Sequence, residues 1–277
     1  MELRALGSTG ITVSALGLGT VKFGRNQGVK YPRGFALPSD QQIRDLLAQA
    51  RELGINLLDT APAYGSSEER LGRLLPPAQS HWIISTKVGE TFQQGKSVFD
   101  FSAAATQTSV ERSLRLLRRE SLDLVLIHSD GDDERILQQT DCLQTLLTLK
   151  ARGWIRAVGM SSKTVAGGLL AVTHCDVVMV TYNLLSTAEL PVIRRAQQAG
   201  KGVLIKKGLL SGHLQQIQVP AADPVAASMR LLLSEPGVSS VVIGTLNPAH
   251  LQANVAAACL VHDNAARSKK DQAGEKI

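Results

Sequence analysis

Residues 122–128 read LDLVLIH, a segment in which only Asp123 and the final residue, His128, are polar. A strand with one face in solvent alternates apolar and polar side chains, whereas a parallel strand covered on both faces is apolar almost throughout. We therefore interpret 122–128 as a strand that is buried on both sides. The strand ends on a histidine, which places an ionisable side chain at its carboxyl end.

Similar short apolar segments alternate with amphipathic stretches along the whole chain, a pattern typical of repeated βα units. The seven other predicted strands are Ala15–Gly19, Asn56–Asp59, Trp82–Lys87, Ile155–Ser161, Val177–Tyr182, Gly202–Lys206 and Ser240–Ile243. The predicted helices are Asp40–Leu53, Glu68–Leu75, Ala104–Leu117, Leu143–Arg152, Thr164–Val172, Leu190–Ala199, Pro224–Leu233 and Pro248–Ala258. The first helix has the clearest signals, because Ser39 and Gln42 form a potential capping box and Gly54 follows its end.

Eight strands alternating with eight helices predict an α/β protein with a (β/α)₈ TIM barrel. An open, doubly wound sheet would instead need a GxGxxG loop after its first strand, and Gly17, Gly19 and Gly24 do not have that spacing. Residues 1–14 contain GSTG between short apolar stretches and predict an N-terminal β-hairpin that could plug the bottom of the barrel. We expect one barrel domain over residues 1–262, followed by a polar, mobile tail over 263–277 that does not cover the substrate mouth.

The composition of the chain limits the classes of function that it can have. The chain has 277 residues with 44% hydrophobic and 19% charged side chains, which is enough apolar material for one large core. The three cysteines, Cys142, Cys175 and Cys259, have no metal-ligand or disulfide spacing. The net charge is +6, but the basic residues are scattered, so we expect no nucleic-acid partner. Without a signal peptide or an apolar run near 18 residues, we expect a cytoplasmic protein with no membrane segment.

Four ionisable residues follow or end three consecutive predicted strands: Asp59, Tyr64, Lys87 and His128. In a βα barrel these positions converge on one mouth, where active sites lie. Protonating a carbonyl oxygen near neutral pH needs an acid stronger than a free phenol, and we expect Lys87 to lower the pKa of Tyr64 while Asp59 holds the lysine. His128 would orient the carbonyl oxygen. A lysine in the middle of the set would repel a cation, so we expect no metal site.

Residues 54–68, GINLLDTAPAYGSSE, resemble the signature of the aldo-keto reductase family. Four later segments resemble further family motifs in the same order: STKVG (85–89), DLVLIH (123–128), GWIRAVGMS (153–161) and YNLL (182–185). The resemblance extends from Met1 to about Leu260. It implies a catalytic tetrad of the four residues above, NADPH as cofactor with NADH possible, direct hydride transfer to an aldehyde or ketone, and a monomer.

The resemblance also implies a set of cofactor-binding positions, some of which depart from the family pattern. Ser162 and Met179 stand where the family commonly has the asparagine and glutamine that grip the nicotinamide amide, and Lys206 stands near the position of an aromatic residue under the ring. Leu246 replaces a common basic residue beside the adenosine phosphate. The implied cofactor contacts are Gly19, Thr20, Ser161, Ser162, Lys206, Lys207, Leu209, Gly244, Thr245, His250 and Asn254.

These features predict an NADPH-dependent reductase of aldehydes or ketones in which Tyr64 is the general acid. A regulatory or cofactor-sensing protein with little turnover is the alternative, which the altered nicotinamide positions favour. A third reading, in which Lys87 forms a Schiff base as in an aldolase, does not use the tyrosine and histidine. The sequence does not identify the substrate, although the loops after His128 and Leu214 are short and poor in aromatic residues, which predicts an open, permissive pocket.

Overall fold

The computed structural model describes residues 1–75, 81–214 and 223–274, the last eleven of these as backbone only. Eight parallel strands close into a barrel, each hydrogen-bonded to its neighbours on both sides. The predicted (β/α)₈ barrel is therefore confirmed. In order around the barrel the strands are β3 (Leu16–Gly19), β4 (Leu57–Asp59), β5 (Ile83–Val88), β8 (Leu122–His128), β9 (Ile155–Ser161), β10 (Val177–Thr181), β11 (Gly202–Lys206) and β12 (Ser240–Ile243).

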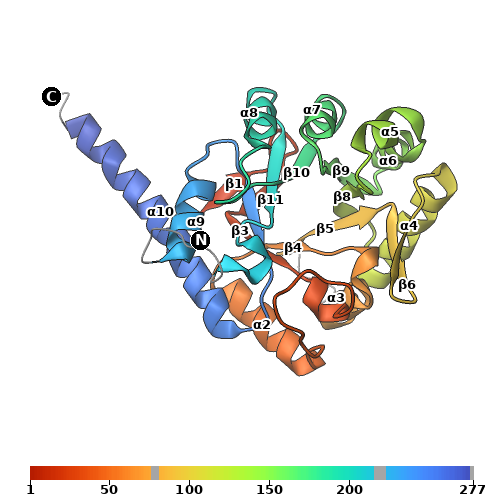
Figure 1. Cartoon of the computed structure of the whole chain (residues 1–277), viewed down its shortest axis with the longest axis horizontal. Helices are drawn as coiled ribbons and strands as arrows, with labels where there is room; N and C mark the ends of the chain where they lie inside the picture. The colour runs from red at the N-terminus through yellow and green to blue at the C-terminus, as the bar shows by residue number, and fades with distance from the viewer. Residues whose placement is uncertain (76–80, 215–222, 275–277) are drawn as a thin grey trace.

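Helices surround the barrel, as Figure 1 shows. They are α2 (Asp40–Glu52), α3 (Ser67–Leu74), α4 (Ala103–Leu117), α6 (Cys142–Ala151), α7 (Val165–His174), α8 (Leu190–Gln198), α9 (Pro224–Leu233) and α10 (Pro248–Gly274). The capping box at the start of α2 is confirmed: the Ser39 hydroxyl accepts from the Gln42 backbone N–H at 3.2 Å, and the Gln42 side chain accepts from the Ser39 backbone at 2.8 Å.

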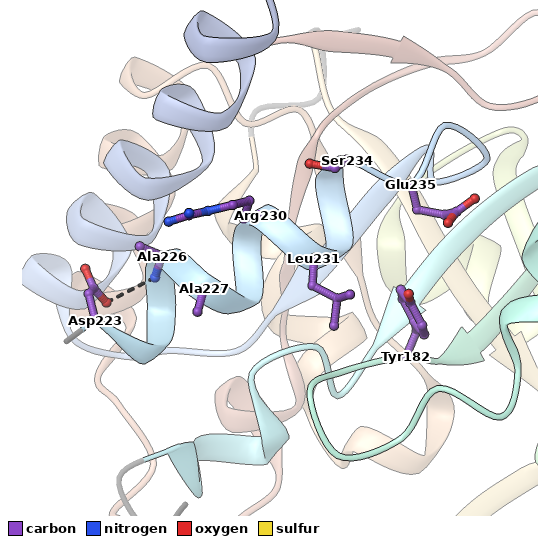
Figure 2. Close-up of a pocket in the computed structure, with 8 residues that line it drawn as sticks. All are labelled: Tyr182, Asp223, Ala226, Ala227, Arg230, Leu231, Ser234 and Glu235. Carbon is purple, nitrogen blue, oxygen red and sulfur yellow. Dashed lines mark hydrogen bonds between the residues drawn. The ribbon is translucent and has the colours of Figure 1, made fainter. Parts of the chain in front are cut away.

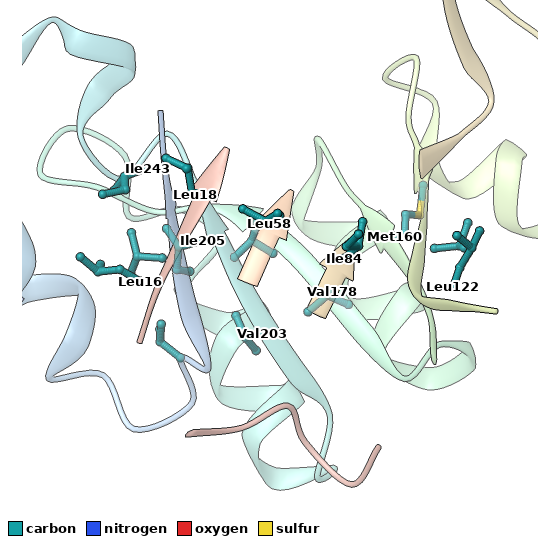
Figure 3. Packing of buried hydrophobic residues seen from close by; sticks show 14 of the residues in the cluster. Leu16, Leu18, Leu58, Ile84, Leu122, Met160, Val178, Val203, Ile205 and Ile243 are labelled. Atoms are coloured by element: carbon teal, nitrogen blue, oxygen red, sulfur yellow. The ribbon is translucent and has the colours of Figure 1, made fainter. Parts of the chain in front are cut away.

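Because successive side chains of a strand point to opposite sides, each barrel strand contributes to two separate apolar layers. Leu57, Leu124 and Leu204 point inward and pack in one cluster inside the barrel. Their neighbours in sequence, such as Leu58 and Ile205, belong to the larger cluster between the strands and the helices (Figure 3). The near-continuous apolar strands of the sequence reflect this burial on both faces.

The N-terminal hairpin closes the barrel at the end opposite the carboxyl ends of the strands, as predicted. Its strands are β1 (Leu3–Ala5) and β2 (Thr12–Ser14). Leu6 and Ile11 lie in the interior cluster of the barrel and are almost completely buried. Gly7 has φ +58°, and a Cβ there would lie 2.3 Å from the backbone nitrogen of Gly202, so only glycine permits this close approach.

Several elements were not predicted. They are the short helices α1 (Val21–Gly24) and α5 (Asp133–Gln139), the 3₁₀ turns η1 (Pro62–Tyr64) and η2 (Leu210–Gly212), and a hairpin of β6 (Glu90–Gln93) and β7 (Lys96–Phe99). Helix α10 continues through most of the predicted tail to Gly274, and in Figure 1 its end projects away from the barrel. The domain limit at residue 262 and the mobility of the tail stay predictions. Within the described residues, no helix is both long and apolar enough to cross a membrane.

Candidate active site

Three of the four candidate catalytic residues are carried by three adjacent barrel strands. Asp59 ends β4, Lys87 is the next-to-last residue of β5, and His128 ends β8. These strands are neighbours in the barrel, with Asp59 opposite Ser85 and Lys87 opposite Leu126. Tyr64 follows in η1, directly after β4. The structure thus brings the four residues together at the carboxyl ends of the strands.

Lys87 and Asp59 form a buried ion pair. The ammonium nitrogen lies 2.7 and 2.8 Å from the two carboxylate oxygens of Asp59 and donates a further hydrogen bond to the carbonyl oxygen of Thr60 at 2.8 Å. The Ser85 hydroxyl also donates to Asp59, at 3.1 Å. With three acceptors the lysine is fully hydrogen-bonded, and its charge is held in one place.

The aromatic ring of Tyr64 lies over this pair, with the Lys87 ammonium nitrogen 4.9 Å from the ring centroid. Burial, together with the negative charges of Asp59 and Glu90, raises the pKa of Tyr64 well above its usual value. The expectation that Lys87 lowers this pKa is therefore wrong for this structure. The physical reason is first that the phenol is buried, and second that Asp59, which lies against the ammonium group, adds its own negative charge near the phenol. Tyr64 consequently keeps its proton throughout the neutral range.

His128 contacts both Tyr64 and a residue that the sequence analysis missed. Its ring is perpendicular to that of Tyr64, with centroids 6.4 Å apart. Its Nδ1 lies 2.8 Å from a carboxylate oxygen of Glu90, the first residue of β6. The direction of this contact departs from that of a regular hydrogen bond, so it is a close electrostatic contact. Burial lowers the pKa of His128, and Lys87 and Lys206 lower it further, while Glu90 raises it.

The implied cofactor-binding residues lie at or after the ends of other barrel strands and on α10. Gly19 and Gly244 lie at the ends of β3 and β12, two strands paired in the barrel. Thr20 is completely buried, and its hydroxyl bonds to the backbone of Asp59 and to Ser67, so its side chain is engaged within the protein. Leu209 packs against the core, and Thr245 is buried, with its hydroxyl accepting from the Asn247 backbone. On α10, His250 is exposed and Asn254 is buried.

Lys206 reaches from β11, which pairs with β12, to β9, whose last residue Ser161 lies opposite His128. Its ammonium group donates to the Ser161 hydroxyl at 2.8 Å and to the backbone carbonyl of Ser162. Burial lowers the pKa of Lys206 to about 7, although Glu189 opposes the shift. Ser162 is itself buried, with its hydroxyl 3.3 Å from Glu189. Both serines that the resemblance assigns to the nicotinamide amide therefore already have partners inside the protein.

Two segments that the sequence analysis did not interpret border the site. The first follows β3 and carries Arg25, whose guanidinium donates to the carbonyl of Ala63 at 3.0 Å and stacks on Phe92 of β6. It also carries Tyr31, whose hydroxyl would be 3.3 Å from a Cβ on Gly244. The second is the β6–β7 hairpin. Its weak sequence signal was Gly95 in the turn between ETFQ and KSVF. In the structure Gln94 and Gly95 both have positive φ, as a tight hairpin turn requires.

The sequence predicts an open substrate mouth that is poor in aromatic residues, and the structure describes one of the two loops on which this prediction depends. The loop after His128 is short, since α5 begins at Asp133. The loop after Leu214 lies outside the described residues. Tyr31 and Phe92 come from other segments, so aromatic side chains do border the site.

A separate cavity of about 680 Å³ lies beside α9 and contains none of the four candidate catalytic residues (Figure 2). It is lined by Tyr182, Asp223, Ala226, Ala227, Arg230, Leu231, Ser234 and Glu235. The chemistry of the converging rim residues, and not this cavity, therefore defines the candidate active site.

Comparisons with known proteins identify the family of this chain. The chain matches the model of the aldo/keto reductase family over residues 15–224. A solved structure from Pseudomonas aeruginosa, described as an aldo-keto reductase, is 54% identical with a TM-score of 0.84, covering 94% of this chain and 95% of that one. The L-galactose dehydrogenase of Arabidopsis thaliana is 27% identical over 93% of this chain and 88% of its own length. The NADH-specific methylglyoxal reductase of Escherichia coli is 27% identical over 79% and 72%, respectively. The chain belongs to the aldo/keto reductase family and is an oxidoreductase of that family.

Proposed function

We propose that this protein reduces aldehydes or ketones to alcohols with NADPH, and that Tyr64 is the general acid. The observation that carries the proposal is the packing of the Tyr64 ring over the buried Lys87–Asp59 pair, with the His128 ring perpendicular to it. A phenol that keeps its proton at neutral pH is available as a donor whenever the substrate oxygen becomes negative. In this proposal, the carbonyl oxygen of the substrate binds between the side chains of Tyr64 and His128.

A nicotinamide cofactor would supply the hydride, and the charge of the rim supports a phosphate-bearing one. Burial lowers the pKa of Lys207, and the charges of Lys30 and Lys163 lower it further, so two other ammonium groups act on Lys207. Among the described residues, no carboxylate forms an ion pair with any of the three. Although Glu189 acts on Lys207 in the opposite direction, cations that are not paired with a carboxylate attract phosphates. Lys207, Gly244 and Asn254 are the residues that we propose for the phosphate and adenosine portions.

The nicotinamide portion is the point at which this chain differs from its family. Met179 is buried inside the barrel and offers no amide, and Ser161 already accepts from Lys206. We propose that Lys206 takes part in binding the nicotinamide end, and that its charge disfavours the oxidised, positive ring. Leu246 packs against the core and provides no charge for a 2′-phosphate, so NADH is a possible second cofactor. The NADH-specific relative in Escherichia coli is consistent with this.

The substitution Tyr64→Phe tests the assignment of the acid. We expect turnover of an aldehyde panel to fall by about 10² to 10⁴. We expect cofactor affinity to stay nearly unchanged, because the hydroxyl acts mainly in the transition state. Single-turnover rates report the first quantity and calorimetric titration reports the second. If the variant keeps more than half of the wild-type chemical rate, Tyr64 is not the acid.

A second candidate function is a cofactor-sensing protein with little turnover. The observation that favours it is the occupation of Ser161 and Ser162 by Lys206 and Glu189. Tight NADPH binding without consumption across a broad carbonyl panel would support this candidate against the first. The Schiff-base reading loses support because the Lys87 amine is engaged by three acceptors, whereas imine formation needs a free amine. A cytoplasmic, monomeric protein remains part of the proposal.

A further inference from the structure

Glu90 lies at the catalytic rim, and nothing in the tetrad scheme requires it. It is the first residue of β6, next to Gly89, whose positive φ of +94° turns the chain at the end of β5. Its side chain is 11% exposed. Buried carboxylates without a compensating partner are costly, so its environment indicates what it does.

The carboxylate of Glu90 is held from three directions. The Ser97 hydroxyl, on the partner strand β7, donates to Oε1 at 2.6 Å. A guanidinium nitrogen of Arg25 lies 3.9 Å from the same oxygen. The other oxygen, Oε2, is 2.8 Å from Nδ1 of His128. Burial opposes ionisation, but these partners outweigh it and lower the pKa of Glu90 to about 2. The group beside His128 is therefore a fixed anion at every physiological pH.

We propose that Glu90 is a positioning residue that acts through His128. Its carboxylate keeps the proton of the neutral imidazole on Nδ1 and stabilises the imidazolium, whose Nε2 then donates a hydrogen bond to the substrate carbonyl. The part of this proposal that concerns turnover rests on the function proposed above. The part that concerns the protonation of His128 does not.

The argument follows from the two nitrogens of the ring. A carboxylate can accept but not donate, and its negative charge favours a proton on the nitrogen 2.8 Å away, even though the direction of the contact departs from that of a regular hydrogen bond. In the neutral ring Nε2 is then bare and can accept a hydrogen bond but not donate one. Only the imidazolium can donate from Nε2 to a carbonyl oxygen. Carbonyl reduction is thus expected to decline as the pH rises through the pKa of His128.

The charged groups around His128 act in opposite directions. Lys87 of β5 and Lys206 of β11 disfavour the imidazolium, as does burial, whereas Glu90 of β6 favours it. Tyr64, from η1, is neutral and has no net charge to contribute in this range. Glu90 is therefore the group that keeps the donor form of His128 accessible. Removing its charge should lower the pKa of His128 further.

The first experiment measures this pKa without any turnover. Ligand-free protein with ¹³C,¹⁵N-labelled histidine is titrated by NMR, and the signal of His128 is assigned by its loss in His128→Asn. Glu90→Gln keeps the shape of the side chain but removes its charge, and we expect it to lower the pKa of His128 by about 1 unit or more. Glu111→Gln, the same change on an exposed helical glutamate of α4, should leave it unchanged.

Glu90→Ala provides a second variant in which the acceptor itself is removed. We expect the neutral imidazole of His128 to lose its preference for the Nδ1 proton, which the ¹⁵N shifts of the ring report directly. An unchanged pKa in Glu90→Gln, or an unchanged tautomer in Glu90→Ala, would overturn the proposal.

The second experiment is the pH profile of carbonyl reduction. In Glu90→Gln, the descending limb of kcat/KM should move to lower pH by the same amount as the pKa of His128, with activity recovered on the acid side. A limb that stays in place while the pKa of His128 moves would overturn the role in reduction. If no variant and not even the wild type reduces any carbonyl while the NMR shift is present, the proposed function fails and the link between Glu90 and His128 stands.

Discussion

Single side chains at the rim show how neighbouring charges decide what a residue type can do. Lysine beside tyrosine suggests a phenol with a lowered pKa, yet the pKa of Tyr64 is raised, because the phenol is buried and because Asp59, 2.7 Å from Lys87, adds a negative charge. Lys206 shows the opposite case. It donates to the buried Ser161 and Ser162, and burial lowers its pKa to about 7 although Glu189 opposes the shift. A lysine with this pKa changes its charge within the physiological range.

The titration of Lys206 predicts a pH-dependent preference between the two redox forms of the cofactor. Below pH 7 the ammonium is protonated and repels the positive nicotinamide of NADP⁺. Above pH 7 it is increasingly neutral and the repulsion fades. Two unit charges about 4 Å apart interact by about 1 kcal/mol even in water. We therefore expect the affinity for NADPH to be at least about five times the affinity for NADP⁺ at pH 6. The ratio of the two affinities should be smaller at pH 8.5, and calorimetric titration measures both.

The neighbouring lysine supplies the control for that measurement. Lys206→Ala should make the ratio of the two affinities independent of pH. Lys207→Ala should weaken the binding of both redox forms by the same factor, because Lys207 is exposed and is proposed to face the phosphates. A wild-type ratio that is the same at both pH values would show that Lys206 does not discriminate between the two forms.

Among the elements, α2 is the one whose start the sequence specifies most completely. The hydroxyl of Ser39 accepts a hydrogen bond from the backbone N–H of Gln42, and the Gln42 side chain accepts one from the backbone N–H of Ser39. The β6–β7 hairpin is specified less well, because its turn uses Gln94 at φ +48°, where asparagine or glycine would be the usual signal. Local sequence thus predicts the helix that supports the barrel but not the hairpin that carries Glu90.

Helix capping makes a prediction at this scale. Ser39→Ala should lower the free energy of unfolding by about 1 kcal/mol, since the backbone N–H at the third position of α2 loses its acceptor. Ser66→Ala is the matched control, because Ser66 precedes α3 in the same place but makes no capping bond with its side chain. Urea unfolding of both variants measures the difference. Equal losses in the two variants would mean that the capping bond of Ser39 does not contribute to stability.

At the scale of the whole molecule, the barrel separates stability from chemistry by placing them at opposite ends. The N-terminal hairpin fills the lower end with Leu6, while the ionisable residues lie at the carboxyl ends of the strands. Leu6 is completely buried, whereas Leu3 of the same hairpin is 57% exposed. Active sites of βα barrels lie at the carboxyl ends, so the plug should contribute to stability alone.

Leu6→Ala tests this separation. We expect a loss of about 2 to 5 kcal/mol in the free energy of unfolding, because the truncated side chain leaves a cavity inside the barrel. The cofactor affinity of the folded fraction should be unchanged. Leu3→Ala should alter the free energy of unfolding by less than about 0.5 kcal/mol, as is usual for exposed positions. A change in cofactor affinity in Leu6→Ala that is absent in Leu3→Ala would show that the plug and the rim are coupled.

The sequence by itself determined the barrel, its eight strands and the four residues that meet at its mouth. This was possible because a strand that is buried on both faces has a nearly continuous apolar sequence, and because the carboxyl ends of the strands converge in any such barrel. Only the tertiary structure decided how those residues are charged. It placed Glu90 against His128, Asp59 against Lys87, and Lys206 against Ser161. Each of these contacts joins residues from different strands, and a pKa depends on distances and burial that the spacing along one chain does not contain.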